Sequence, residues 1–198
     1  MSSHQASDVA GTAGAIEFEA VTKRYPVPAG GRGDAPSAVE SFSARLPAGS
    51  TTVLLGSSGC GKTTLLRMVN CMVDPTRGQV LLDGRDVRDR DPVALRRSIG
   101  YVMQNGGLLP HRRVIDNITL VPRLCETDRA TARHRAHELM EMLGLDGDLA
   151  GRYPHQLSGG QAQRVGVARA LAADPGVLLM DEPFGAVDPL VRRELQRE

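Results

Sequence analysis

A glycine-rich octapeptide has the residue types and spacing to bind a polyphosphate. It reads Gly56-Ser57-Ser58-Gly59-Cys60-Gly61-Lys62-Thr63, and Thr64 follows it. Glycines let the backbone curl so that successive N–H groups face one anion, and the N-terminus of a following helix adds partial positive charge. Lys62 supplies a full charge and Thr63 a hydroxyl for Mg²⁺, so the pattern predicts a nucleoside triphosphate site. The alternative is a glycine-rich turn with an incidental lysine, although the chain has only one other lysine, Lys23.

Two carboxylates follow the apolar run Val177–Met180. We expect this run to be a buried strand, with Asp181 and Glu182 buried at its C-terminal end, where α/β sheets place their ligands. Desolvating an unpaired carboxylate is costly, and Mg²⁺ would compensate for that cost at Asp181. Glu182 would then orient or deprotonate an attacking water. The alternative is a carboxylate pair that caps the following turn.

The elements that must position these groups alternate between strands and helices. Thr51–Leu55 predicts a buried strand before the glycine-rich loop, and Thr63–Met72 predicts the helix after it. Strands are also expected at 16–21, 38–46, 79–82, 99–103 and 177–180, and helices at 124–145 (with Leu139, Met142 and Leu143 at helical spacing) and 162–173. The first two strands, joined by a Gly/Pro-rich loop over 27–37, suggest a hairpin. Together the elements predict an α/β domain over 15–198 with a mostly parallel sheet, a helical subdomain at about 107–157 and a mobile tail over 1–14.

Composition excludes several classes of protein. The 198 residues are 41% hydrophobic and 24% charged, which is typical of one globular domain. A net charge of +1 gives no argument for a nucleic-acid partner. Three cysteines without a C-x-x-C pair argue against a disulfide framework or a zinc site, and Cys60 is interpreted as a small loop residue. With neither a secretory signal nor a 20-residue apolar run, we expect a cytoplasmic chain or one held at a membrane by a partner.

A second motif carries a family resemblance. Leu157-Ser158-Gly159-Gly160-Gln161 alone would suit a helix N-cap, but it stands about twenty residues before Val177–Glu182 and there resembles the signature motif of ABC ATPases. Tyr25 then matches the aromatic residue that stacks on adenine, or is an ordinary edge-strand tyrosine. Gln104 matches the glutamine that senses Mg²⁺ and the attacking water, or is a polar strand end. Asp188, in Gly185–Asp188, matches a loop at the dimer interface.

The resemblance implies a fold and an assembly. The fold is an ABC-type nucleotide-binding domain of the P-loop NTPases: a RecA-like mixed or parallel sheet core, an antiparallel β-subdomain and an inserted α-helical subdomain. The implied homodimer holds two ATP molecules, each contacted by the phosphate loop, Gln104, Asp181 and Glu182 of one subunit and by Ser158–Gln161 of the other. Catalysis would fall to Glu182, Gln104 and Lys62, and Mg²⁺ to Thr63, Gln104 and Asp181.

The partners follow from a finer resemblance. The segments 91–105, 152–157 and 164–193 are similar to ATPases of importers for glycine betaine, proline, choline and carnitine, with small departures at Gly106 and Ala162. The helical subdomain would dock on membrane permease subunits and, through them, serve a substrate-binding protein at the inner face of the membrane. No physical property of these residues connects them with a quaternary amine, so this step rests on analogy.

In the family, one more strand follows Glu182 and ends in a histidine, whereas this sequence has no histidine after His155. We therefore expect the fold to be incomplete at the C-terminus, with a gap in the sheet beside Thr51–Leu55 and Val177–Met180 and exposed apolar side chains on both. Residues 1–198 alone would be marginally stable and would hydrolyse ATP poorly. The alternatives to an importer ATPase are a module that binds ATP without turnover and an ABC ATPase that acts outside transport.

Overall fold

The computed structural model describes residues 14–26, 37–104 and 106–182. Residues 1–13 of the predicted tail, the loop over 27–36 and Asp188 lie outside them. The α-helices and strands are β1 (Ile16–Arg24), β2 (Ser37–Leu46), α1 (Lys62–Val69), β3 (Arg77–Leu82), β4 (Arg85–Asp86), α2 (Pro92–Ser98), β5 (Ile99–Val102), α3 (Val114–Ile118), α4 (Leu120–Leu124), α5 (Arg129–Met142), α6 (Gly159–Leu171) and β6 (Val177–Met180). Three 3₁₀ helices complete them: η1 (Val87–Asp89), η2 (Gly147–Gly151) and η3 (Pro154–Gln156).

The N-terminal half forms an antiparallel sheet with the order β2-β1-β3-β4. The predicted hairpin between the first two strands is confirmed, with Phe18 opposite Ala44. Alternation along β1 buries Ile16 and Phe18, and Phe18 meets Phe42 edge to face with ring centroids 5.5 Å apart. This sheet carries the chain to the phosphate loop, since β2 precedes that loop and α1 follows it.

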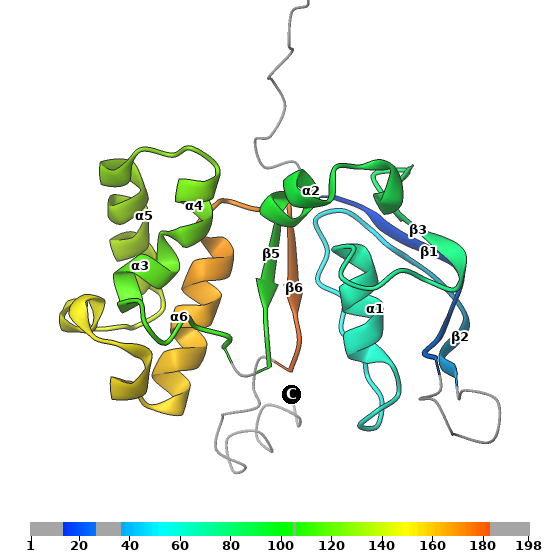
Figure 1. Ribbon diagram of the computed structural model, residues 1–198, viewed down its shortest axis with the longest axis horizontal. Helices are drawn as coiled ribbons and strands as arrows, with labels where there is room; N and C mark the ends of the chain where they lie inside the picture. The colour runs from blue at the N-terminus through cyan, green and yellow to red at the C-terminus, as the bar shows by residue number, and fades with distance from the viewer. Residues whose placement is uncertain (1–13, 27–36, 105, 183–198) are drawn as a thin grey trace, which may run out of the picture.

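The second sheet is a parallel pair, β5 and β6. Its register pairs Ile99 with Val177 and Val102 with Met180, so both strands end at the same edge. Figure 1 shows this pair in the centre of the molecule, with helices α3 to α6 on one side and α1 with the antiparallel sheet on the other. Because parallel strands end together, the residues that follow them, Gln104 and Asp181, come from segments far apart in sequence to one edge.

Two hydrophobic clusters lie on the two sides. One joins α1 to the antiparallel sheet, and the other joins α3, α5 and α6. In the second, Leu139 and Met140 of α5 are 1% exposed, whereas Met142 is 68% exposed. Leu139 and Met140 share one buried face of α5 with Ala136, and helical geometry places Met142 about 100° around the helix from the middle of that face. The prediction that Met142 lies on the same apolar face as Leu139 is therefore wrong.

Thr51–Leu55 does not form the predicted buried strand. No described strand pairs with it, and Val53 and Leu55 are 70% and 89% exposed. An apolar run shows that a segment favours burial, but a strand also requires a hydrogen-bonding neighbour, and here β5 and β6 pair with each other. The expected exposure of apolar side chains is confirmed at Val53 and Leu55 and, on β6, at Met180, which is 37% exposed.

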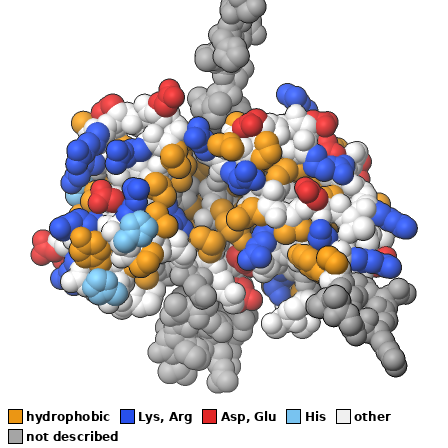
Figure 2. Space-filling view, viewed as in Figure 1, with side chains coloured by type: hydrophobic (Ala, Val, Ile, Leu, Met, Phe, Trp, Pro, Cys, Tyr) orange, Lys and Arg blue, Asp and Glu red, His pale blue; other side chains and the backbone are white. Residues whose placement is uncertain are grey.

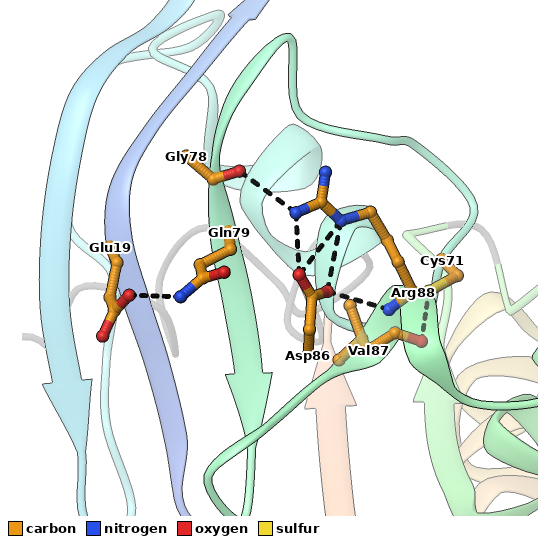
Figure 3. A network of polar contacts seen from close by, with 7 residues as sticks. All are labelled: Glu19, Cys71, Gly78, Gln79, Asp86, Val87 and Arg88. Atoms are coloured by element: carbon orange, nitrogen blue, oxygen red, sulfur yellow. Dashed lines mark hydrogen bonds and ion pairs between the residues drawn. The ribbon is translucent and has the colours of Figure 1, made fainter.

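A polar network connects the end of α1 with the β3–β4 hairpin (Figure 3). Arg88 donates to Asp86 through Nη2 at 2.7 Å and to the Gly78 carbonyl at 3.5 Å. The Cys71 thiol donates to the Val87 carbonyl at 3.3 Å. These bonds hold η1 against α1 and so brace the helix that begins at the phosphate loop. Within residues 14–26, 37–104 and 106–182, no helix combines the length and apolar character that crossing a membrane requires.

Candidate functional site

The phosphate loop is shaped by glycines with two different tasks. Gly61, the N-cap of α1, has φ +94°, and a Cβ there would collide with the Ala38 carbonyl oxygen and lie 3.0 Å from Val39 Cγ2. Gly59 has φ +80° but nothing within 4 Å of its would-be Cβ. Both need the left-handed conformation that glycine adopts without steric cost. Only Gly61 also lets the loop lie directly against β2.

The backbone amides of this loop are free to bind a ligand. Among the described residues, no protein acceptor is recorded for the N–H groups of Ser58, Gly59 and Gly61 or of the first three residues of α1, whereas Cys60 N closes a turn to Ser57 O at 3.3 Å. Helix N-termini leave such donors unpaired and carry partial positive charge. The loop therefore presents an array of donors that suits phosphate oxygens.

Lys62 folds its ammonium back over the loop. Nζ donates to the carbonyl oxygens of Gly56 at 2.9 Å and Ser57 at 3.0 Å, and lies 3.6 Å from Cys60 Sγ. These carbonyls hold the positive charge at the mouth of the loop without neutralising it. A polyphosphate bound by the amides would meet that charge directly.

Thr63 and Asp181 meet although they are 118 residues apart. The Thr63 hydroxyl donates to Asp181 Oδ1 at 2.8 Å, and the Tyr101 hydroxyl donates to Oδ2 at 3.4 Å. Asp181 is 5% exposed, and these two hydrogen bonds give each of its buried carboxylate oxygens a partner within the protein. Tyr101 was not identified from the sequence. Burial raises the pKa of Tyr101, which keeps its phenol protonated and able to donate.

Gln104 and Glu182 form the second long-range pair. Gln104 Nε2 donates to Glu182 Oε2 at 2.5 Å. Glu182 is exposed, so the prediction of a buried pair of carboxylates is right for Asp181 and wrong for Glu182. Asp181 is held at the start of α1 by its hydrogen bond from Thr63, whereas Glu182 has a left-handed backbone, with φ +48°, and its side chain is exposed. A non-glycine residue in this conformation is strained, and such strain is common at functional sites.

The oxygen atoms near the phosphate loop fit Mg²⁺. Thr63 Oγ1 and Asp181 Oδ1 lie together beside it, while Gln104 donates through Nε2 to Glu182, which leaves its amide oxygen as a further candidate ligand. Within the part of the chain that the structure describes, no group of three or more His, Cys, Asp or Glu side chains is placed to hold a metal. One or two protein oxygens completed by phosphate oxygens and water is the arrangement that Mg²⁺ prefers.

Tyr25 lies beside the start of α1. Its hydroxyl is 3.4 Å from Thr64 Oγ1, and Lys23 Nζ is 5.2 Å from the centre of its ring. Tyr25 is 44% exposed. Tyr25 directly follows β1, which lies between β2 and β3 in the described sheet and so is not an edge strand. It presents an aromatic face next to the phosphate loop that a planar ring can stack on.

The segment 157–161 begins helix α6. Ser158 is the N-cap: its Oγ accepts from Gln161 N at 3.2 Å, while Gln161 Oε1 accepts from Ser158 N at 2.9 Å, which is a capping box. A Cβ on Gly160 would meet nothing within 4 Å. Packing among the described residues therefore gives no reason for glycine at 160. No described hydrogen bond joins this segment to the phosphate loop, so the structure does not bring these two predicted groups together.

Comparison with known proteins agrees with this geometry. A family model described as ABC transporter matches residues 39–185. The osmoprotectant import ATP-binding protein OsmV of Salmonella typhimurium is 49% identical over 184 residues, which are 92% of this chain and 47% of that protein. The glycine betaine uptake system ATP-binding protein YehX of Escherichia coli is also 49% identical, over 92% of this chain and 57% of that protein. The choline transport ATP-binding protein OpuBA of Bacillus subtilis is 45% identical, over 92% and 46%.

The fold is also similar to solved structures. A dimeric structure of MJ0796, a bacterial ABC transporter cassette, superposes with a TM-score of 0.78 at 34% identity, covering 92% of this chain and 80% of that one. A post-hydrolysis state of the same cassette bound to ADP and Pi matches equally well, with a TM-score of 0.78 at 32% identity. The chain spans about half the length of the curated relatives it matches. By family model, by sequence and by fold, the chain belongs to the ATP-binding proteins of the ABC transporter family.

Proposed function

We propose that the protein binds Mg-ATP at the phosphate loop and hydrolyses it. The observation that carries this proposal is the convergence of two long-range pairs, Thr63 with Asp181 and Gln104 with Glu182, at the edge where β5 and β6 end. Thr63 and Asp181 would supply oxygen ligands for Mg²⁺, and Gln104 binds the Glu182 carboxylate at the same edge of the β5–β6 pair. Gly56–Thr64 would hold the phosphates, and Tyr25 would stack on the adenine.

Thr63 and Asp181, with Gln104 as a further candidate ligand, would hold Mg²⁺, which when bound would offset the charge of the phosphates. The protein's own groups supply the rest of the chemistry. Lys62 and the loop amides stabilise charge that develops on the γ-phosphoryl oxygens. Glu182, exposed and hydrogen-bonded to Gln104, accepts a proton from the attacking water and holds it in line.

We further propose that two copies close head to tail over two ATP molecules. Gly160 supports this assembly. Packing among the described residues does not require a glycine there, and the absence of a side chain would let another molecule approach the backbone closely. Ser158–Gln161 of each copy would add the N-terminus of α6 to the γ-phosphate bound by the other. Asp188 would lie at the interface; it is outside the described residues. The dimeric neighbour MJ0796 also supports this assembly.

The transport role rests on the relatives. OsmV, YehX and OpuBA carry names of importers for osmoprotectants, glycine betaine and choline, which supports import of a quaternary amine, with proline as a further candidate. The chain would then lie at the cytoplasmic face of a membrane, docked on permease subunits that receive substrate from a binding protein. A pocket of about 210 Å³ lies between the two sides of the molecule. Its lining includes Met72, Met103 and Val121, which would provide an apolar docking site for such a permease. Figure 2 shows hydrophobic side chains along the middle of the face that it draws.

The hydrolysis proposal is tested by phosphate release from Mg-ATP. We expect turnover in the wild-type protein, retained ATP binding without turnover in Glu182→Gln, and weakened ATP binding in Lys62→Ala. Binding without wild-type turnover would instead support the alternative of an ATP-binding module. Turnover in Glu182→Gln equal to that of the wild type would remove Glu182 from its proposed role.

The import proposal is tested in cells from which the gene is deleted. We expect uptake of labelled glycine betaine or choline to return with the wild-type gene and not with Lys62→Ala. Co-purification with a membrane permease would support the same conclusion. Wild-type ATP hydrolysis without any permease or uptake phenotype would favour an ABC ATPase that acts outside transport.

A further inference from the structure

We propose that Arg169 of α6 is a positioning residue for Gln104, and that it ties the Gln104 segment to the helix that begins at Ser158. This inference rests on the proposed hydrolysis of ATP. It concerns how Gln104 is held against Glu182, and it adds a residue that the motifs of the sequence do not single out.

Arg169 is a buried cation that is paired with backbone rather than with a carboxylate. The residue is 8% exposed, and burial lowers its pKa. Among the described residues, no carboxylate lies within ion-pair distance of it. Its guanidinium donates from Nη1 to the Gly107 carbonyl at 2.8 Å and from Nη2 to the Gly106 carbonyl at 2.9 Å. A buried charge is costly to desolvate, so these two bonds must be kept for the charge to stay there.

The two carbonyls belong to the turn that carries Gln104. Gly106 N donates to Met103 O at 2.9 Å, which closes a turn around Gln104. Gly106 and Gly107 both adopt the left-handed conformation, with φ +69° and +55°. The planar fork of arginine donates to both oxygens at once, which a lysine ammonium does less well because it is a point charge. Arg169 therefore fixes the C-terminal end of this turn.

Close packing reinforces the bonds. Ala162, Gly166 and Arg169 lie on one face of α6, four and three residues apart. A Cβ on Gly106 would lie 3.3 Å from the Ala162 carbonyl oxygen, and one on Gly166 would lie 3.2 Å from the Gly106 carbonyl oxygen. The turn and the helix are thus in backbone contact. Gly106, one of the small departures from the importer pattern, suits this contact because it has no side chain.

A continuous chain of contacts therefore runs from α6 to Glu182. Arg169 holds Gly106 and Gly107, their turn holds Gln104, and Gln104 donates to Glu182 at 2.5 Å. A displacement of α6 would be passed to the Gln104 amide, because the contacts between them are bonded and close-packed. Loss of the Arg169 bonds would leave the phosphate loop intact but would release Gln104 from its place.

The test is a double-mutant cycle of Arg169→Met and Gln104→Ala in the purified protein. Arg169→Met removes both bonds and keeps a long side chain in the site. We expect unchanged ATP affinity and a fall in kcat of about tenfold to a hundredfold, as for a misplaced catalytic group. If Arg169 acts through Gln104, Arg169→Met has no further effect on kcat in the Gln104→Ala background. A fall of the same size in both backgrounds would overturn the proposal.

A second readout does not depend on hydrolysis. Hydrogen exchange of the peptide that spans 103–107, measured without nucleotide, should be faster in Arg169→Met, because the hydrogen bond from the Gly106 N–H to the Met103 carbonyl becomes weaker. Arg164→Met is the matched control: Arg164 also lies on α6 and donates to carbonyls, of Leu143 and Gly144, but it is far from the Gln104 turn in the hydrogen-bond network. It should leave both the exchange and kcat unchanged.

The outcomes separate the two proposals. A wild-type protein without turnover would contradict the proposed hydrolysis, while the exchange measurement would still test the Arg169 contact. Turnover in the wild type with unchanged exchange and kcat in Arg169→Met would overturn this inference alone. If Arg169→Met does not fold, Arg169→Lys replaces it in the same cycle, since it keeps the charge and loses the bidentate fork.

Discussion

Replacing Gly61 by alanine tests how the phosphate loop is built. Gly61 has φ +94°, and the new Cβ would collide with the backbone oxygen of Ala38 in β2. Neither the left-handed backbone of residue 61 nor its collision with Ala38 can be relieved by rotating a flexible side chain, because the colliding oxygen belongs to the backbone of a strand. The matched control is Gly59→Ala, where φ is +80° but nothing lies within 4 Å of the new methyl group.

The two substitutions share one cost and differ in another. A left-handed alanine costs about 1–2 kcal/mol, which both variants carry. Overpacking against a rigid neighbour adds about 1–3 kcal/mol, which only Gly61→Ala carries. We therefore expect the free energy of unfolding to fall by about 1–2 kcal/mol in Gly59→Ala and by about 2–5 kcal/mol in Gly61→Ala. The difference between the variants measures the close approach of the loop to β2.

Urea unfolding measures the two free energies, and a fluorescent ATP analogue measures the affinity of the folded protein. Because Gly61→Ala must move the loop amides away from β2, we expect it to weaken binding more than tenfold, or more than about 1.4 kcal/mol. Gly59→Ala should weaken binding less. Equal losses of stability in the two variants would refute the argument from the Ala38 contact.

Three further predictions follow from other parts of the molecule. Gly160→Ala should leave the free energy of unfolding unchanged or raise it by up to about 1 kcal/mol, because its methyl group meets nothing within the described chain. It should nevertheless lower ATP hydrolysis more than tenfold, because in the proposed dimer the methyl group would lie against the ATP bound by the other copy. Mg-ATP should protect the exposed Cys60 from alkylation, while Cys71, whose pKa is raised by burial, should react slowly with or without it. The hydrogen bond from Arg88 lowers the pKa of Asp86, so Asp86→Asn should be less stable than wild type at neutral pH. That difference should vanish as the pH falls through the folded-state pKa, where the wild-type carboxylate is protonated.

Each of these predictions has a control within the chain. Gly147→Ala also has open space around its new methyl group but lies away from the site, so it should leave hydrolysis unchanged. Cys125 is exposed and should be alkylated equally with and without Mg-ATP. Asp89→Asn removes an exposed carboxylate in the same 3₁₀ helix as Arg88 for which no side-chain hydrogen bond is recorded among the described residues, so at neutral pH its stability should match that of the wild type. Hydrolysis by Gly160→Ala at the wild-type rate, protection of Cys125 or a constant Asp86→Asn difference down to acid pH would each contradict the corresponding argument.

The sequence by itself determined the features that depend on neighbouring residues. Glycines at set positions permit the left-handed turns before Lys62, whatever else surrounds them. Ser158 and Gln161 stand three residues apart, which is the spacing of a capping box, and they form one at the start of α6. Alternation predicted the buried side of β1 at Ile16 and Phe18, but it fails from Ala20, where a positive φ and a register shift leave Ala20 exposed and bury Val21. In each case the physical cause is local backbone geometry, so a short stretch of residues carries the whole signal.

Only the tertiary structure decided which distant groups meet. The Thr63–Asp181 and Gln104–Glu182 pairs span 118 and 78 residues, and they form because β5 and β6 end at one edge beside α1. The bonds from Arg169 to the Gln104 turn depend likewise on where α6 packs. The same dependence explains the error at Thr51–Leu55: its apolar side chains favour burial, but a strand forms only where another strand supplies hydrogen-bond partners, and that is a property of the whole sheet.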